Sequence, residues 1–274
     1  MDYPNRPAVM LMNYWGMIKL ADPTSKARQV LTSKQIDGVP ALVLQDIAAD
    51  ESIKFKFDKY PNDLWDGMLL FKDDKRAILI NTQRGLIGRH NFTFAHELGH
   101  YFLDHQPTAT IDGKPVIRCT TADIRNNANS NEVEANRFAS EMLMPEEQFR
   151  FDMAGAPIDF GLIGSLSNKY MVSKHACGIR IANFTQAPCV IIRTSGMNII
   201  GVTASRSASN FLQNLATIPA ETTAQKVITT GFWQKEFTEC ASSLWLQRTI
   251  PNEIIYECTY IPKDSKFATI ILKW

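Results

Sequence analysis

The chain has 274 residues, 45% of them hydrophobic, and its formal net charge at pH 7 is +1. This length suffices for about two domains with their own cores, and the small net charge gives no overall attraction to nucleic acid or to a membrane surface. Because there is no apolar run of ~18 residues, no signal-peptide pattern in residues 1–10 and no CxxC pair among five scattered cysteines, we expect a cytoplasmic protein without membrane spans or disulfides.

The first third of the chain contains few readable signals. Residues 25–31 and 42–50 are compatible with a helix and a strand, with a break at residues 38–40. Residues 67–71 and 77–81 alternate as two strands joined by a polar turn, which predicts a hairpin. An extended substrate could pair with an exposed edge of this hairpin, or the hairpin could only complete a sheet; both interpretations stay open.

The most informative segment is the pentapeptide HELGH, from His96 to His100, inside an apolar helical pattern over residues 92–104. On a helix the two histidines lie about 40° apart on adjacent turns, so both rings can bind one zinc ion. Glu97 would then accept a proton from the water that attacks a peptide bond. Gly99 lies on the core face, where we expect a second element to approach closely. The alternative is that the pattern arises by accident on a helix with surface histidines.

A third metal ligand must come from another segment. The longer pattern HExxHxxGxxH is excluded, because Leu103 and Gln106 stand where it needs glycine and histidine. On the same helix, His105 points about 140° away from His100, and we interpret it as a solvated histidine near a helix end.

Residues 131–145 form a strong helix pattern that ends at a proline, and they supply the best candidate ligand. Glu132 falls on the apolar stripe, where a carboxylate is costly to bury unless a cation neutralises it. Asn136 follows one turn later and could orient a ligand histidine, although an ordinary buried amide explains it equally well. The other charged residues of the segment, Glu134, Arg137 and Glu141, fall on the far side, and we interpret Glu134 as solvated.

The stretches FTFAHELGHYFLDH and EVEANRFASEMLMP, in this order and spacing, resemble the ImmA/IrrE family of bacterial and phage zinc metallo-endopeptidases. The resemblance is specific over residues 76–145. It implies that His96, His100 and Glu132 bind one zinc ion, which manganese could replace in activity assays, and that Glu97 is the general base. It also implies cleavage of a helix-turn-helix repressor that controls a stress response or a mobile element. Many members carry their own N-terminal repressor-like domain; none is recognisable here, so the substrate would be a separate protein.

After Pro145, residues 159–170 and 174–184 predict two helices around a tight turn, which is helix-turn-helix spacing. Lys174, His175 and Arg180 could contact DNA phosphates, but we favour a pair that packs on the peptidase domain. From residue 188 the chain is β-rich, with strand patterns over residues 189–194, 197–205, 253–261 and 267–274. By the family resemblance this part is similar to a GAF-type sensor domain; a purely structural cap fits equally well.

The sequence thus predicts an α+β protein in three parts. These are a zincin-like peptidase domain over residues 1–150 with the HExxH helix beside a small sheet, a helix-turn-helix-like segment over 151–187, and an antiparallel α+β domain over 188–274. The first hypothesis is a zinc endopeptidase that cleaves a repressor or an antitoxin. The second is a zinc-bearing regulator that binds DNA or a protein partner without significant proteolysis. The presence of Glu97 favours the first, because a scaffold has no chemical need for a carboxylate there.

Overall fold

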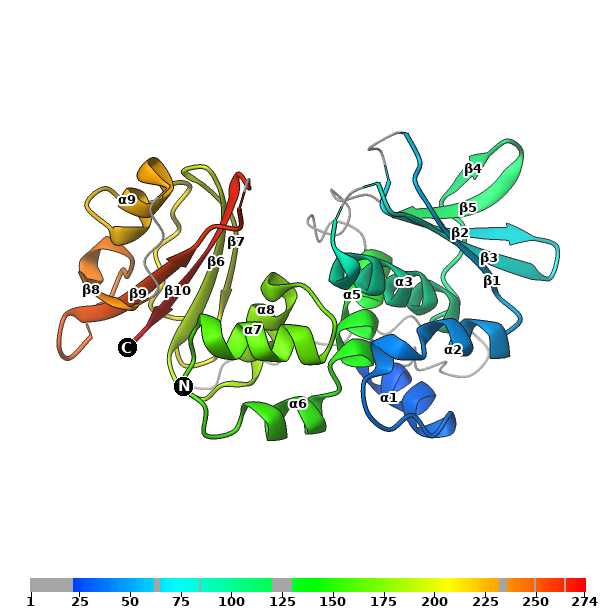
Figure 1. Ribbon diagram of the computed structural model, residues 1–274, viewed down its shortest axis with the longest axis horizontal. Coiled ribbons are helices and arrows are strands. Elements are labelled where there is room, and N and C mark those ends of the chain that lie inside the picture. The colour runs from blue at the N-terminus through cyan, green and yellow to red at the C-terminus, as the bar shows by residue number, and fades with distance from the viewer. Residues whose placement is uncertain are drawn as a thin grey trace, which may run out of the picture.

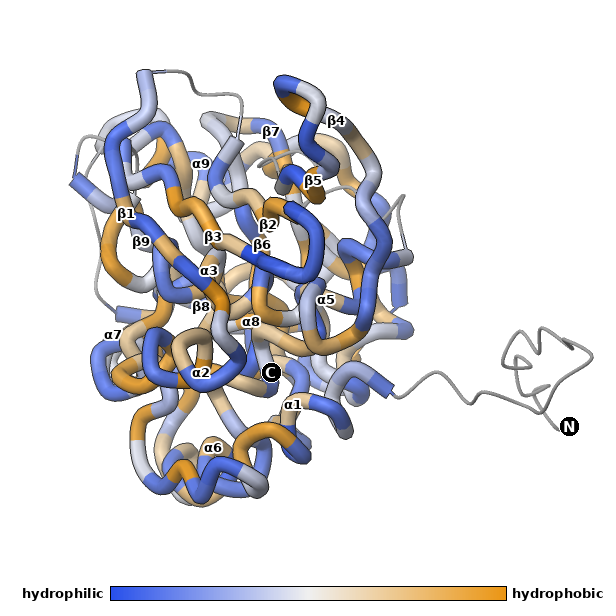
Figure 2. Tube along the Cα trace, turned by 90° about the vertical axis from the view of Figure 1, so that its right-hand side faces the viewer, coloured by the Kyte–Doolittle hydropathy of each residue, from blue (hydrophilic) through white to orange (hydrophobic). Residues whose placement is uncertain are grey.

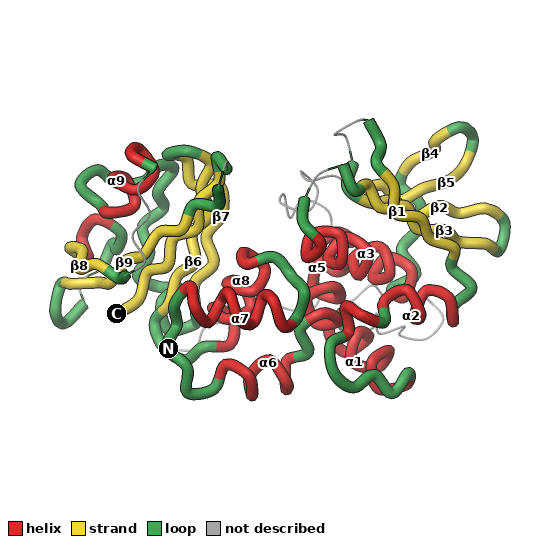
Figure 3. Tube along the Cα trace, in the orientation of Figure 1, coloured by secondary structure: helices red, strands yellow, loops and turns green. Residues whose placement is uncertain are grey.

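The computed structural model describes residues 22–61, 65–83, 85–119, 130–231, 236–248, 250–263 and 265–274. Residues 1–10, in which we expect no signal peptide, lie outside this part. The chain forms an α+β structure with two five-stranded sheets. The sheets lie at opposite ends of the molecule and most of the helices lie between them (Figures 1 and 3).

The first sheet has the strand order β1-β3-β2-β5-β4, and only β1 and β3 are parallel. Its strands are β1 (Lys54–Asp58), β2 (Gly67–Lys72), β3 (Lys75–Asn81), β4 (Ala109–Ile111) and β5 (Lys114–Cys119). The predicted hairpin is confirmed as β2 and β3. Each of its strands has neighbours on both sides, since β3 also pairs with β1 and β2 with β5. The hairpin therefore completes the sheet and offers no free edge to a substrate.

Two helices precede this sheet, α1 (Pro23–Ser33) and α2 (Leu44–Asp50), with a short 3-10 turn η1 (Pro40–Leu42) between them. The strand expected over residues 42–50 is wrong, because most of this segment is α2. Leu44, Ile47 and Ala48 are buried at helical spacing, and they pack into the same core as Ala27 of α1. A short apolar run without Gly or Pro fits a helix as well as a strand, and packing decides between them.

The HELGH helix is α3 (Ile87–Phe102), and it packs against α5 (Ser130–Leu143). Gly99 is the point of close approach: a Cβ atom there would lie 3.1 Å from the Phe138 ring and 3.2 Å from the backbone of Ala135. The expected packing role of this glycine is confirmed. The close contact brings the first turn of α5 beside the histidines of α3.

Ion pairs hold the C-terminal half of α5 in place. Glu141 is buried, contrary to its expected place on the outer side of the helix, and its carboxylate accepts from Arg28 of α1 and from Arg180. Arg180 lies on α8 (Lys174–Phe184) and also donates to the carbonyl oxygen of Met144. Burial of a carboxylate is tolerated here because two guanidinium groups neutralise it. Arg180 is therefore not available to DNA phosphates.

The predicted pair of helices is present as α7 (Phe160–Lys169) and α8, which follow the short helix α6 (Glu146–Met153). The turn between α7 and α8 docks on the N-terminal end of α3. A Cβ atom at Gly88 would lie 2.4 Å from the Val172 carbonyl carbon, and the side-chain amide of Asn91 donates to the Met171 carbonyl oxygen at 2.9 Å. The turn thus packs on the peptidase part, which is the interpretation that the sequence favours.

The second sheet is antiparallel throughout, with the order β7-β6-β10-β9-β8. The four strands read from the sequence are present as β6 (Cys189–Ser195), β7 (Asn198–Ala204), β9 (Ile254–Tyr260) and β10 (Phe267–Lys273). The structure adds the edge strand β8 (Thr238–Ala241), the helix α9 (Thr223–Thr230) and the 3-10 turn η2 (Ser242–Leu244).

One hydrophobic core runs from the first sheet to one face of the second. This core includes Ile78 of β3, Leu98 of α3, Ile163 of α7 and Ile191 of β6. It therefore combines residues from both sides of the predicted boundaries at residues 150 and 187. A second core covers the other face of the second sheet under α9. Hydrophobic residues are concentrated in the packed strands and helices, and hydrophilic residues in many of the connecting turns (Figure 2). Among the described residues, no helix has both the length and the hydropathy of a membrane span.

Candidate metal centre

Helix α3 and helix α5 place three potential metal ligands together. The Nε2 atoms of His96 and His100 lie 3.0 Å apart, and the two carboxylate oxygens of Glu132 lie 3.1 Å and 3.4 Å from them, respectively. All three side chains are buried. The structure therefore brings together the His96, His100 and Glu132 side chains that the sequence proposed as ligands, from two segments separated by some thirty residues.

Each histidine has a partner at its other ring nitrogen. The Nδ1 atom of His96 lies 3.0 Å from the side-chain oxygen of Asn136, one turn after Glu132 on α5. An amide oxygen only accepts, so Nδ1 of His96 donates in this contact, and in the neutral ring the Nε2 lone pair is left for a metal ion. Asn136 therefore contacts His96, one of the two candidate metal-binding histidines.

The expectation for His105 is wrong: the residue is only 7% exposed, and its Nδ1 lies 2.8 Å from Nδ1 of His100. Helix α3 ends at Phe102, and Asp104 adopts a left-handed conformation with φ 55°. The chain then turns back, and the His105 backbone N–H donates to the His100 carbonyl oxygen. The 140° separation assumed a continuing helix. The sequence contained one signal for this turn: Asp104 lies at the end of the apolar pattern, and aspartate tolerates the left-handed conformation that ends a helix.

Glu134 completes this chain of contacts. Its carboxylate lies 3.2 Å from Nε2 of His105, and its side chain is about one-third exposed rather than fully solvated. A carboxylate accepts, so Nε2 of His105 donates to it and Nδ1 of His105 is an acceptor. That acceptor takes the proton of His100 Nδ1, which leaves the Nε2 lone pair of His100 directed at the cluster. Sequence reasoning missed both His105 and Glu134.

Glu97 lies next to the ligands but makes different contacts. Its side chain is fully buried, and neither carboxylate oxygen has a hydrogen-bond partner among the described residues. Strand β2 passes directly over it: a Cβ atom at Gly67 would lie 2.6 Å from Glu97 Oε1 and 2.5 Å from the methyl group of Thr93. Gly67 is a second residue that sequence reasoning missed, although a glycine at the start of a strand often marks such a close approach.

The environment shifts the pKa values of this cluster in different directions. Burial lowers the pKa of His100 to about 4 and favours the neutral ring that binds metal. Burial by itself would raise the pKa of Glu132, but His100 and His96, which donate to it whenever Nε2 carries a proton, hold it below its usual value. Burial, reinforced by the charge of Glu132, raises the pKa of Glu97 well above that of an ordinary glutamate. Of the two carboxyl groups, Glu132 is therefore charged more readily and Glu97 holds its proton more tightly.

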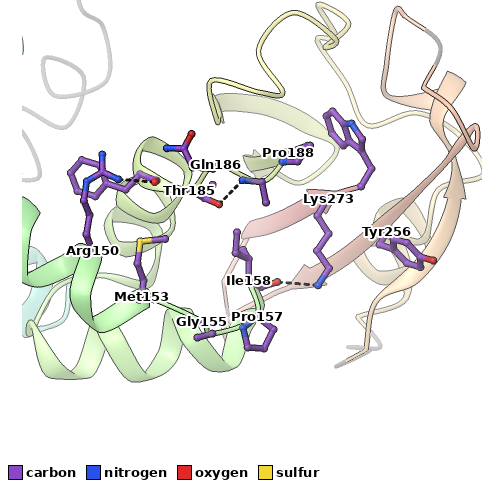
Figure 4. A pocket seen from close by; sticks show the side chains of 15 residues that line it. Arg150, Met153, Gly155, Pro157, Ile158, Thr185, Gln186, Pro188, Tyr256 and Lys273 are labelled. Carbon is purple, nitrogen blue, oxygen red and sulfur yellow. Dashed lines mark hydrogen bonds between the residues drawn. The ribbon is translucent and has the colours of Figure 1, made fainter.

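A separate cavity of about 640 Å³ lies away from this cluster, between the α6–α7 connection and the last strands of the second sheet (Figure 4). Two basic residues in its wall are already engaged: Arg150 donates to the Phe184 carbonyl oxygen and Lys273 to the Ile158 carbonyl oxygen. No member of the His96–His100–Glu132 cluster lines this cavity.

Two histidines on one helix and a glutamate on the helix packed against it form a group of side chains that could hold one metal ion. Residues 55–182 match the family model of the IrrE N-terminal-like domain of peptidase family M78. This match confirms the predicted resemblance to the ImmA/IrrE family for this part of the chain. The cluster and Glu97 all fall inside the matched range.

Among solved structures, the chain is similar to a Mycobacterium tuberculosis transcriptional regulator, with a TM-score of 0.59 and 12% sequence identity. The similarity covers 92% of this chain and 76% of the other. At 12% identity, this similarity shows only that the two folds are alike. No curated protein sequence matches the chain.

Proposed function

We propose that this protein is a zinc-dependent endopeptidase of the zincin type that cleaves a helix-turn-helix repressor or an antitoxin. The observation that carries the proposal is the convergence of His96, His100 and Glu132 around one point, with the buried carboxyl group of Glu97 beside them. A structural metal site would use four protein ligands, whereas three ligands and a neighbouring acid are the pattern of a hydrolytic site.

The three ligand residues fit a zinc ion by their chemistry. Neutral imidazole nitrogens and a carboxylate oxygen are common zinc ligands, and the orientations of His96 and His100 leave both Nε2 lone pairs toward Glu132. Two carboxyl groups buried within one cluster repel each other, and a divalent cation would relieve that repulsion. Manganese accepts the same ligand types and would serve in activity assays.

When bound, the ion supplies Lewis acidity at a coordination position that the protein leaves open. Glu97 accepts a proton from the attacking water as the new C–O bond forms, and it delivers a proton to the amine as the C–N bond breaks. Asn136 and the His105–Glu134 pair hold the two ligand histidines in the required tautomers. The tight cover of Gly67 over Glu97 limits the positions that this carboxylate can take.

The rest of the chain is proposed to serve regulation. Residues 188–274 would act as a GAF-like sensor domain, linked by the helix-turn-helix-like segment 151–187 to the peptidase domain 1–150. The cavity of Figure 4 borders residues of the last two parts and is where a small effector would be sought. Because α8 packs on the second sheet and Arg180 is buried against Glu141, this helix pair is proposed to transmit contacts rather than to bind DNA.

The test is to incubate the purified protein, loaded with zinc or manganese, with each repressor or antitoxin encoded near its gene and to look for a single cut by mass spectrometry. We expect Glu97→Gln to keep the metal and lose cleavage, and His96→Ala to lose both. His90→Ala, on the same helix but outside the cluster, is the matched control and should cleave normally. Full cleavage by the glutamine variant would refute the role of Glu97. No cut under any condition, together with tight duplex binding, would favour a zinc-bearing regulator.

A further inference from the structure

The hairpin of the first sheet offers no free edge, but an edge strand of the second sheet lies close to the metal centre. β7 is the outermost strand on the side of this sheet that faces the α3–α5 helices (Figure 1). At its start, the Ile199 N–H donates to the Ala216 carbonyl oxygen. From Ile200 to Ala204, no described residue forms a strand pair with the outer side of β7.

The free part of this edge lines a groove of about 540 Å³. The other walls come from the N-terminal half of α3, the middle of α5 and the N-terminal half of α8. Two lining residues connect the groove to the metal centre: Thr93 stands one turn before Glu97, and Asn136 contacts His96. A polypeptide in this groove would therefore lie against the same helices that hold the cluster.

The described lining of the groove is basic. Its lining includes Arg89, His175 and Arg193 and contains no carboxylate. Arg89 is held at Nη2 by Asp66, 2.6 Å away, and the guanidinium of Arg193 lies 5.0 Å from the centre of the Phe267 ring. Asp66 offsets part of this charge at Arg89, but the charged groups described at the groove remain net positive, which favours carboxylates over basic segments.

The edge strand β7 has few of the features that protect natural edge strands from pairing with another chain. Natural edge strands are commonly protected by charged residues, proline or a β-bulge. Residues 198–204 contain no charged residue and no proline, and the register shift at Ile200 leaves residues 202–204 beyond the bulge. Ile200 and Val202 are 37% and 50% exposed. The Ser205 N–H donates to Cys189 of β6, and backbone groups alternate along a strand, so the N–H and C=O of Val202 point outward from the sheet.

From these observations we propose that the groove binds an extended acidic segment of the protein substrate, which adds as a strand to the free edge of β7. The backbone of the segment pairs with β7, and its acidic side chains contact Arg193 and Arg89. This inference rests on the proposed peptidase function, since it names where and by what chemistry that substrate is held. Backbone pairing supplies affinity and the arginines supply selectivity.

The test uses the full chain with Glu97→Gln, loaded with zinc, and two fluorescein-labelled peptides of roughly ten residues, long enough to span the strand. One peptide alternates threonine with glutamate and the other threonine with lysine. Fluorescence anisotropy should show at least about tenfold tighter binding of the acidic peptide. Adding Arg193→Glu should remove that preference. Adding Val202→Pro, which deletes an outward N–H but no bond within the sheet, should weaken the acidic peptide about tenfold.

Val202→Ala is the matched control, because it shortens the side chain but keeps the backbone donor, and it should weaken binding much less than proline. The inference is overturned if neither peptide binds at millimolar concentration, if both bind equally, or if Arg193→Glu leaves the preference intact. It is also overturned if a DNA duplex binds the groove and displaces the acidic peptide. These outcomes are separate from the proposed function. Cleavage of a repressor that is unaffected by Arg193→Glu and Val202→Pro would reject only the groove, whereas peptide binding without any cleavage would reject only the peptidase.

Discussion

Replacement of His105 by alanine tests whether contacts behind the ligand histidines control metal binding. In the native protein, Nδ1 of His105 accepts from Nδ1 of His100 at 2.8 Å, and Glu134 fixes the tautomer of His105. Without His105, the buried N–H of His100 loses its acceptor and the ring can turn or change tautomer. Loss of such a partner typically lowers metal affinity 10–100-fold, which corresponds to about 1.4–2.8 kcal/mol.

The measurement is competition for zinc with a chromophoric chelator, followed by the visible spectrum of the cobalt-substituted protein, which reports ligand geometry. We expect weaker zinc binding and a changed cobalt spectrum for His105→Ala. Glu134→Gln should lose less, because the amide oxygen of glutamine still accepts from His105 Nε2. His90→Ala, elsewhere on α3, should bind zinc like the native protein. Native zinc affinity and an unchanged cobalt spectrum in His105→Ala would refute the reasoning.

Three further predictions concern the same region. Gly67→Ala should abolish cleavage and reduce metal-free stability, since the new methyl group would lie 2.6 Å from Glu97 Oε1; native activity would contradict this. Arg180→Met should destabilise the protein by about 3 kcal/mol in chemical denaturation, because it strips the buried Glu141 of one of its two cations, and adding Glu141→Leu should recover part of that loss. Without metal, Glu97→Gln should be more stable than the native protein, and the difference should grow as the pH rises above about 4.5. The Glu97 carboxyl ionises there in the unfolded chain, whereas burial keeps it protonated in the folded protein. A difference in thermal midpoint that is the same at pH 4 and pH 8 would contradict this prediction.

Local sequence patterns predicted much of the fold, where hydrophobic periodicity and tertiary burial agree. The β2–β3 hairpin, the long helices α3 and α5 and four of the five strands of the second sheet lie where alternation or helical spacing put them. The pattern failed at residues 42–50, where a short apolar run is ambiguous. It also gave no indication of β8, a strand of four residues at the edge of the sheet.

The sequence by itself determined the proposed ligand set, because HELGH fixes two histidines and Glu97 on one helix, and the apolar stripe of the next helix makes Glu132 costly to bury without a cation. Only the tertiary structure decided what surrounds these residues. His105 folds back because the chain leaves the helix at Asp104, Glu141 is buried because arginines from two other helices reach it, and Gly67 covers Glu97 because β2 crosses α3. Spacing along one helix is a property of local geometry, whereas contacts between distant segments depend on packing that no single segment encodes.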